Sequence, residues 1–155
     1  QGLNLKLYLM KYIKKLNPQE LGFRQGVLRT GGYFYISKKA AKNFFGSLRK
    51  DVNNDQKIIT MSCVDGKFES AEISYVYHND KFNTDRGTRD EYRIYLNGQI
   101  QFHVLQFMPN DIVIFEKSRN DLLFLHLKEN DLRYPQYLSA LQTHGVKGNH
   151  AIILD

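Results

Sequence analysis

The sequence predicts a mainly β (α+β) domain, built as a closed or half-closed barrel with short helices. Several short segments alternate apolar and polar residues and follow one another at regular spacing, which is typical of such barrels. Asp65-Gly66 and Asn97-Gly98 are strong signals for tight hairpin turns between strands. The chain has 155 residues, of which 42% are hydrophobic, enough for one domain with its own core.

The composition favours some kinds of binding partner and excludes several kinds of site. The chain carries 22 Lys and Arg against 16 Asp and Glu, a net charge of +6, which favours a polyanionic partner. No stretch approaches the roughly 20 apolar residues of a membrane span, so no membrane partner is expected. Cys63 is the only cysteine, which excludes an intrachain disulfide and a cysteine-based zinc site. We expect an intracellular, cytoplasmic location, and Gln1-Gly2 in place of Met suggests a piece of a longer protein or a residual cloning sequence.

Residues 3–16 fit two patterns. Apolar positions 5, 9, 12, 13 and 16 follow a helical stripe, whereas the leucines at 3, 5, 7 and 9 alternate as in a strand. The length, the lysine-rich opposite face and the stop at Asn17-Pro18 favour a helix.

The remaining elements are mostly strands. A short helix is expected over residues 38–45, capped by Ser37 and ended by Gly46, and another over 134–141. Residues 100–107 either continue the preceding strand or begin a short helix, and the chain ends in an apolar tail at 151–154. Strands are expected at 33–37, 58–64, 68–77, 91–96, 111–117 and 122–127.

Two polar, glycine-containing loops, 23–32 and 78–90, carry the side chains that read base edges in DNA. A loop of thirteen residues without structure of its own is long for a compact domain and points to function or disorder. Taken alone, each loop is equally typical of solvated surface. The candidate residues are Arg24, Gln25, Arg29, Thr30 and Gly31 in the first loop and His78, Asn79, Asp80, Lys81, Asn83, Thr84, Asp85, Arg86, Thr88 and Arg89 in the second.

Charged residues flank both loops. Lys38, Lys39 and Lys42 follow the first loop directly, where they could hold phosphates, although the residues alone favour a solvated helix face. Glu91 and Arg93 follow the second loop, and strand alternation places them on one face, where an ion pair could orient the loop.

One pattern in the sequence could indicate catalysis. Two carboxylates with a lysine are the minimal pattern of a metal-dependent nuclease, which Asp55, Asp65 and Lys67 could supply. The expected hairpin turn at Asp65-Gly66 explains that pattern without catalysis. No glycine-rich nucleotide loop, serine nucleophile elbow or metal-binding histidine pair occurs. We therefore expect no enzyme activity, no metal and no cofactor in this domain.

The order of features resembles a known family. Arg29-Thr30-Gly31-Gly32-Tyr33-Phe34-Tyr35-Ile36-Ser37-Lys38-Lys39 looks like a glycine-rich turn into a strand that ends in a Pro-Lys or Ser-Lys step. Asn110-Asp111-Ile112-Val113-Ile114-Phe115 looks like a Gly-Asp-x-x-x-Phe step, and residues 87–93 resemble the exit from a second recognition loop. Together these features resemble the B3-like DNA-binding pseudobarrel of restriction endonucleases, as in the EcoRII N-terminal, BfiI C-terminal and LlaJI-type N-terminal domains. The family's Pro at position 37 and Gly at position 110 are absent.

The resemblance implies a seven-stranded pseudobarrel with short flanking helices that recognises a specific double-stranded DNA site in a prokaryotic cell. An N-arm (residues 24–32) and a C-arm (residues 78–89) would grip the major groove, and cleavage would belong to the remaining domains or subunits of a restriction complex. We expect one domain over 1–155, with a helical lead (1–20), a pseudobarrel core (21–130) and a helix and strand extension (131–155). The alternatives are the metal-dependent nuclease above and a protein-interaction barrel.

Overall fold

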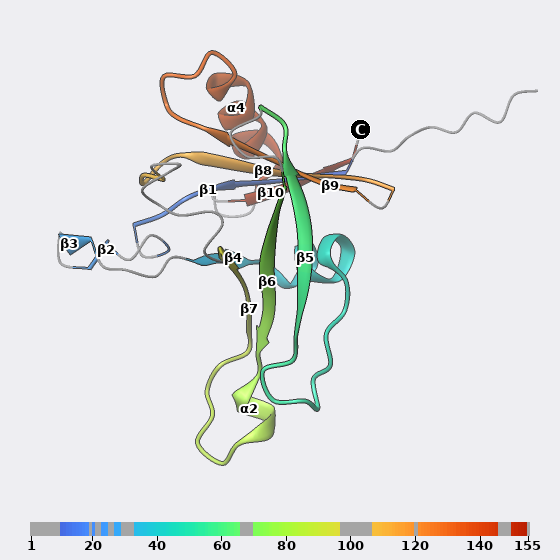
Figure 1. The fold of residues 1–155 in the computed structure, drawn as a ribbon. Helices are drawn as coiled ribbons and strands as arrows, with labels where there is room; N and C mark the ends of the chain where they lie inside the picture. Colours follow the sequence, from blue (N-terminus) through green and yellow to red (C-terminus); the bar gives the residue numbers. More distant parts are fainter. Residues whose placement is uncertain are drawn as a thin grey trace, which may run out of the picture.

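The computed structural model describes residues 10–18, 20, 23–24, 27–28, 33–65, 70–96, 107–119, 121–145 and 150–154. One eight-stranded sheet curls into a half-barrel (Figure 1), in which every neighbouring pair is antiparallel except β9 and β5. In spatial order the strands are β10 (His150–Leu154), β1 (Met10–Lys15), β8 (Ile112–Ser118), β9 (Asp121–Leu127), β5 (Gln56–Cys63), β6 (Ser70–His78), β7 (Glu91–Leu96) and β4 (Tyr33–Ile36).

The smaller elements are β2 (Phe23–Arg24) and β3 (Val27–Leu28), which pair with each other, and the helices α1 (Lys38–Ala40), η2 (Ala41–Phe45, a π-helix), α2 (Asp80–Asn83) and α4 (Tyr134–His144). The Ser37 hydroxyl accepts a hydrogen bond from the Ala40 N–H at 3.1 Å. Gly46 ends η2 with φ of 98°, a conformation that favours glycine. Both predicted caps are confirmed. None of the described helices is long and apolar enough to span a membrane.

The predicted helix over 3–16 is wrong for residues 10–15, which form strand β1. This strand pairs with β10 on one side and β8 on the other. Tyr12 faces the inside of the half-barrel and stacks on Phe115, while Ile13 faces α4 and shares a cluster with Leu141. Because both faces are covered, the adjacent residues Tyr12 and Ile13 are both buried although they point to opposite faces, so the strand lacks the apolar–polar alternation that would have identified it.

Strands β4 to β9 lie where the sequence predicts strands, and the hairpins β5–β6 and β8–β9 are confirmed, whereas the short strands β2 and β3 lie in the segment predicted as a loop. The sheet has eight strands where the resemblance implied seven: six of them are the strands predicted from the sequence, and β1 from the expected lead and β10 from the expected extension add two at one edge. Helix α4 covers that end of the sheet (Figure 1) and runs three residues beyond its predicted end at 141. Residues 97–106, with their expected turn and the strand or helix beginning at 100, lie outside the described residues.

Within the part of the chain that the structure describes, side-chain contacts link β1, the strand next to the β10 end of the sheet, to β4 at the other end. The Lys14 ammonium on β1 lies 2.8 Å from the Glu20 carboxylate, and both side chains are almost fully buried. The same oxygen of Glu20, Oε2, also accepts a hydrogen bond from the Tyr35 N–H on the edge strand β4, at 2.8 Å. The Tyr12 hydroxyl on β1 also accepts from the Ser37 N–H at 3.4 Å. These bonds join β1 to β4 and satisfy a backbone group on an edge strand.

The turn before β8 carries the second motif of the resemblance. Asn110 adopts φ of 74°, the left-handed conformation in which glycine is the preferred residue and Asn the next. The departure from the family's glycine is therefore compatible with the same turn. Asp111 is 2% exposed and receives hydrogen bonds from His126 at 2.7 Å, Lys128 at 2.9 Å and the Met108 N–H at 2.9 Å.

These contacts predict acid sensitivity. Burial alone would raise the pKa of Asp111, but the bonds from His126, Lys128 and Met108 outweigh it and hold the pKa below its usual value of 3.8. The stabilisation is therefore complete above 3.8 and is lost as the pH falls through the lower folded value. We expect Asp111→Asn to lower the free energy of unfolding by about 2–3 kcal/mol at neutral pH. In urea titrations the difference from the parent chain should shrink in acid, whereas Asp85→Asn, at an exposed position, should behave like the parent at both pH values.

Candidate nucleic-acid interface

The C-arm is an ordered structure rather than the unstructured loop expected from the sequence. It begins at the end of β6, forms the short helix α2 and returns to β7. The Asp80 carboxylate accepts from the Arg89 N–H at 2.6 Å and from the Arg89 guanidinium at 3.1 Å, which ties the two sides of the arm together. These contacts, led by the Arg89 N–H, lower the pKa of Asp80 and keep it charged. A side chain at Gly87 would collide with the Asp80 carbonyl, so the close approach requires glycine.

Asn79 does not fit the role of a base reader, because its side chain is fully buried. Its amide nitrogen donates to the Val52 and Arg49 carbonyls at 2.8 and 3.0 Å, and its amide oxygen accepts from the Asn54 N–H at 2.8 Å. Asn79 thereby fixes the neighbouring loop, residues 46–55, against the arm.

Asn83 and Thr84 also bond within the protein. Asn83 donates to the Lys50 carbonyl at 2.9 Å, and the Thr84 hydroxyl donates to the Asp80 carbonyl at 3.0 Å. Asp80, Asn83 and Thr84 therefore shape the arm through their own contacts. Four further candidate residues on the arm, Lys81, Asp85, Arg86 and Thr88, are exposed, as are Thr84 and Phe82.

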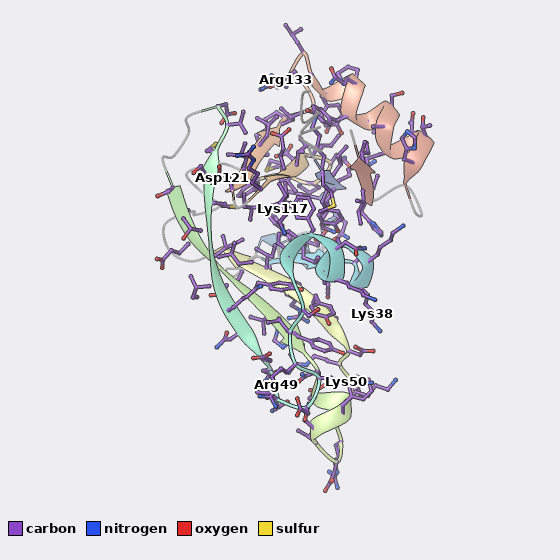
Figure 2. All side chains as sticks on the ribbon, turned by 90° about the vertical axis from the view of Figure 1, so that its right-hand side faces the viewer. Lys38, Arg49, Lys50, Lys117, Asp121 and Arg133 are labelled. Carbon is purple, nitrogen blue, oxygen red and sulfur yellow. The ribbon has the colours of Figure 1, made fainter. Side chains whose placement is uncertain are left out.

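Loop 46–55 brings two cations to the arm that sequence reasoning missed. Arg49 and Lys50 lie beside α2 (Figure 2), and the Lys50 ammonium sits 4.0 Å from the centre of the Phe82 ring. Arg49 pairs with Asp51 at 3.0 Å. No motif marks this loop as part of the site, because its position depends on the buried Asn79, whose role is visible only in three dimensions.

The outer faces of β4 and β7 carry a cluster of aromatic and charged side chains. The Arg93 guanidinium makes two bonds to Glu91, at 3.1 and 3.2 Å, as strand alternation predicted. It also lies 4.1 Å from the centre of the Tyr33 ring, a cation–π contact, and donates to the Tyr95 hydroxyl at 3.1 Å. Its bonds to Glu91 and Tyr95 outweigh the effect of burial and raise the pKa of Arg93, so it stays charged.

His78 belongs to this cluster rather than to the tip of the C-arm. Its ring nitrogen Nε2 lies 2.8 Å from the Tyr95 hydroxyl. Burial, followed by the charges of Arg93 and Arg89, lowers the pKa of His78, which favours the neutral ring.

The predicted phosphate-binding lysines lie on α1 and η2. Lys38 forms an ion pair with Asp90 at 2.6 Å, and Asp90 also accepts from the Tyr77 hydroxyl at 2.6 Å. These bonds, with that from Lys38 the larger, lower the pKa of Asp90. Lys38, Lys39 and Lys42 are exposed, so each can still meet an anion from solvent.

The N-arm contains the two-stranded hairpin β2–β3. The side chain of Arg24 and the whole of Gln25, Arg29, Thr30 and Gly31 lie outside the described residues. The placement of the arms follows from their connections. The N-arm leads to Tyr33, which pairs with Tyr95, while the C-arm leads to Glu91, four residues back along β7. At about 3.4 Å per residue the two attachment points are about 14 Å apart. In Figure 1 β2–β3 and α2 project in different directions from the β4–β7 pair.

The residues of the nuclease alternative are not brought together. Asp55 precedes β5 and accepts from the Arg49 N–H at 2.6 Å, whereas Asp65 follows the other end of that strand. Ten residues of extended chain separate them by about 30 Å, so they cannot share a metal ion. Lys67 lies outside the described residues. Within the described ranges there is no group of three acidic, histidine or cysteine side chains that could hold a metal.

Comparison with solved structures decides the fold. The chain has the fold of the N-terminal domain of Helicobacter pylori LlaJI.R1. The match has a TM-score of 0.59 and covers 94% of this chain and 98% of that domain, with 17% sequence identity. The resemblance to LlaJI-type N-terminal domains is thereby confirmed at the level of the fold. No protein-family model matches the sequence, and no curated protein matches it.

Proposed function

We propose that this chain is the DNA-recognition domain of a prokaryotic restriction system, which binds a specific double-stranded site and carries no catalytic centre. The main observation behind this proposal is that the two arms are attached about 14 Å apart, at opposite ends of the β4–β7 pair. This separation is close to the roughly 12 Å width of the major groove of B-DNA. The fold shared with the LlaJI.R1 domain supports the assignment. Cleavage would be carried out by other domains or subunits in the cytoplasm, and this domain would need no cofactor.

The residues divide into three roles in this proposal. The exposed C-arm residues Lys81, Asp85, Arg86 and Thr88 would meet base edges, together with the N-arm residues Arg24, Gln25, Arg29 and Thr30. Buried or internally bonded C-arm residues would hold the arm in shape, because base discrimination requires side chains fixed on a rigid support. The cations outside the arms would contact phosphates, namely Lys38, Lys39, Lys42, Arg49 and Lys50.

The first test is selection of bound duplexes from a randomised pool, prepared in methylated and unmethylated forms, followed by affinity measurements on Arg86→Ala. We expect this change to weaken binding to the selected duplex by about 10- to 100-fold, the effect of losing one bidentate base contact, and to change binding to a scrambled duplex much less.

Arg133→Ala is the matched control, because Arg133 is exposed at the end of the molecule away from α2 (Figure 2) and should leave both affinities unchanged. Equal losses on both duplexes would place Arg86 among the phosphate contacts instead. Failure of the parent chain to bind any duplex at low salt would contradict the proposed function.

A further inference from the structure

Strand β5 has an open edge inside the sheet. It pairs with β6 from Gln56 to Ser62, but with β9 only at Ser62 and Cys63. Figure 1 shows the two strands diverging below the point where they meet. Between Gln56 and Met61, the side of β5 that faces away from β6 therefore has no strand partner in the described part of the chain.

The register identifies which backbone groups face the gap. The Tyr77 N–H donates to the Asp55 carbonyl at 2.9 Å, so Asp55 and Tyr77 form a hydrogen-bonded pair. Bonded and non-bonded pairs alternate along an antiparallel ladder. Lys57, Ile59 and Met61 therefore bond to β6. The N–H and C=O groups of Gln56, Ile58 and Thr60 point the other way, into the gap.

The gap is a cavity of about 420 Å³. One wall is β5, from Lys57 to Thr60, and the opposite wall is the tip of the β8–β9 hairpin, including Lys117 and Leu122. Phe44 and Phe45 of η2 also line it. Ile58, a large apolar residue in the middle of this strand, lines the cavity and is 56% exposed.

The charge around the gap is positive. Lys57, Lys117 and Arg119 line it together with one carboxylate, that of Asp121. Lys117 donates to the Phe44 carbonyl at 3.2 Å and lies close to Asp121 and η2 in the view of Figure 2. Over the described ranges, none of the three cations forms an ion pair within 4.0 Å.

A phosphate backbone fits this gap poorly. Phosphate oxygens accept hydrogen bonds but donate none, so they would face the outward carbonyls of Ile58 and Thr60 unfavourably and leave the apolar wall in water. An extended peptide supplies both hydrogen-bond donors and acceptors along a strand edge. Its successive side chains point to opposite faces of the sheet, so one face can be aliphatic and the other acidic.

We propose that the open edge of β5 binds an extended acidic segment of a partner protein as an added strand, with aliphatic side chains on the face of Ile58 and carboxylates on the opposite face, toward Lys57 and Lys117, with Arg119 nearby. This surface faces the viewer in Figure 2, whereas β2–β3 lies on the opposite side of the molecule in Figure 1.

The test uses the full chain, labelled for NMR, and the blocked peptide acetyl-Val-Glu-Val-Glu-Val-Glu-amide. At saturating peptide, we expect amide hydrogen exchange at Ile58 and Thr60 to slow by at least about tenfold, because their N–H groups become bonded. The lysine analogue acetyl-Val-Lys-Val-Lys-Val-Lys-amide should bind more weakly. Equal binding of the two peptides, or protection elsewhere only, would overturn the proposal, as would protection of the same amides by a DNA duplex instead.

Thr60→Pro removes one N–H on the open side and leaves the β6 ladder intact, a position at which proline is tolerated. We expect it to weaken peptide binding by about five- to tenfold, the effect of one lost backbone hydrogen bond, while Thr60→Ala keeps the parent affinity. Arg119→Glu, at an exposed turn, should reverse the preference between the two peptides if Thr60→Pro fails to fold. Affinity for the selected duplex should be unchanged in all three variants, so failure of this proposal would leave the DNA proposal standing.

Discussion

Replacing Lys14 with methionine is expected to lower the free energy of unfolding by about 3–5 kcal/mol, the largest effect of any single change considered for this chain. Lys14 and Glu20 are 4% and 0% exposed, and their charged groups lie 2.8 Å apart. Methionine keeps most of the side-chain volume but leaves the Glu20 carboxylate buried without its cation. Burial, which is the dominant influence, already raises the pKa of Glu20 against the opposing effects of Lys14 and two backbone N–H groups. Loss of Lys14 should raise it further.

The loss should appear as a lower urea midpoint with an unchanged slope. Lys11→Met is the matched control on the same strand, because the Lys11–Glu116 pair is partly exposed at 3.8 Å and should contribute at most about 1 kcal/mol. Adding Glu20→Gln to Lys14→Met removes the buried charge and should restore part of the lost stability. A Lys14→Met variant as stable as Lys11→Met would show that the pair does not hold β1 and β4 together.

The sequence predicts local structure in this protein better than it predicts contacts between segments. The strands at 33–36 and 91–96, the Ser37 cap and the β8–β9 hairpin follow from alternation and from turn and cap residues, which act over a few positions. Strand β1 could not be recognised in the same way, because its two strand neighbours and the covering helix come from distant parts of the chain.

The same limit applies to the candidate site. Composition marks 78–90 as a polar loop with suitable side chains, but it does not separate Asn79, which is buried, from Arg86, which is exposed. Arg49 and Lys50 join the site through a loop that no motif connects to it. The ion pair between Glu91 and Arg93 could be predicted, since alternation along one strand is enough to place both on the same face.

The second large effect is expected at Asn79. Asn79→Ala should lower the free energy of unfolding by about 2–4 kcal/mol, because it removes a fully buried side chain and leaves several partly buried backbone groups of loop 46–55 without partners. If the proposed function holds, affinity for the selected duplex should also fall, since the loop and α2 would lose their fixed relation while Arg86 itself remains. Asn83→Ala is the control, because Asn83 is partly exposed and should affect stability by about 1 kcal/mol or less.

Asn79→Asp separates hydrogen bonding from packing. The two side chains have nearly the same shape, but the aspartate cannot donate to the Val52 and Arg49 carbonyls and places a carboxylate oxygen opposite them. It should therefore be at least as unstable as Asn79→Ala at neutral pH and should recover in acid, where the carboxyl is protonated and regains a donor. If Asn79→Asp were as stable as the parent chain at neutral pH, the amide bonds would not be what holds loop 46–55 to the C-arm, and the placement of Arg49 and Lys50 beside α2 would need another cause.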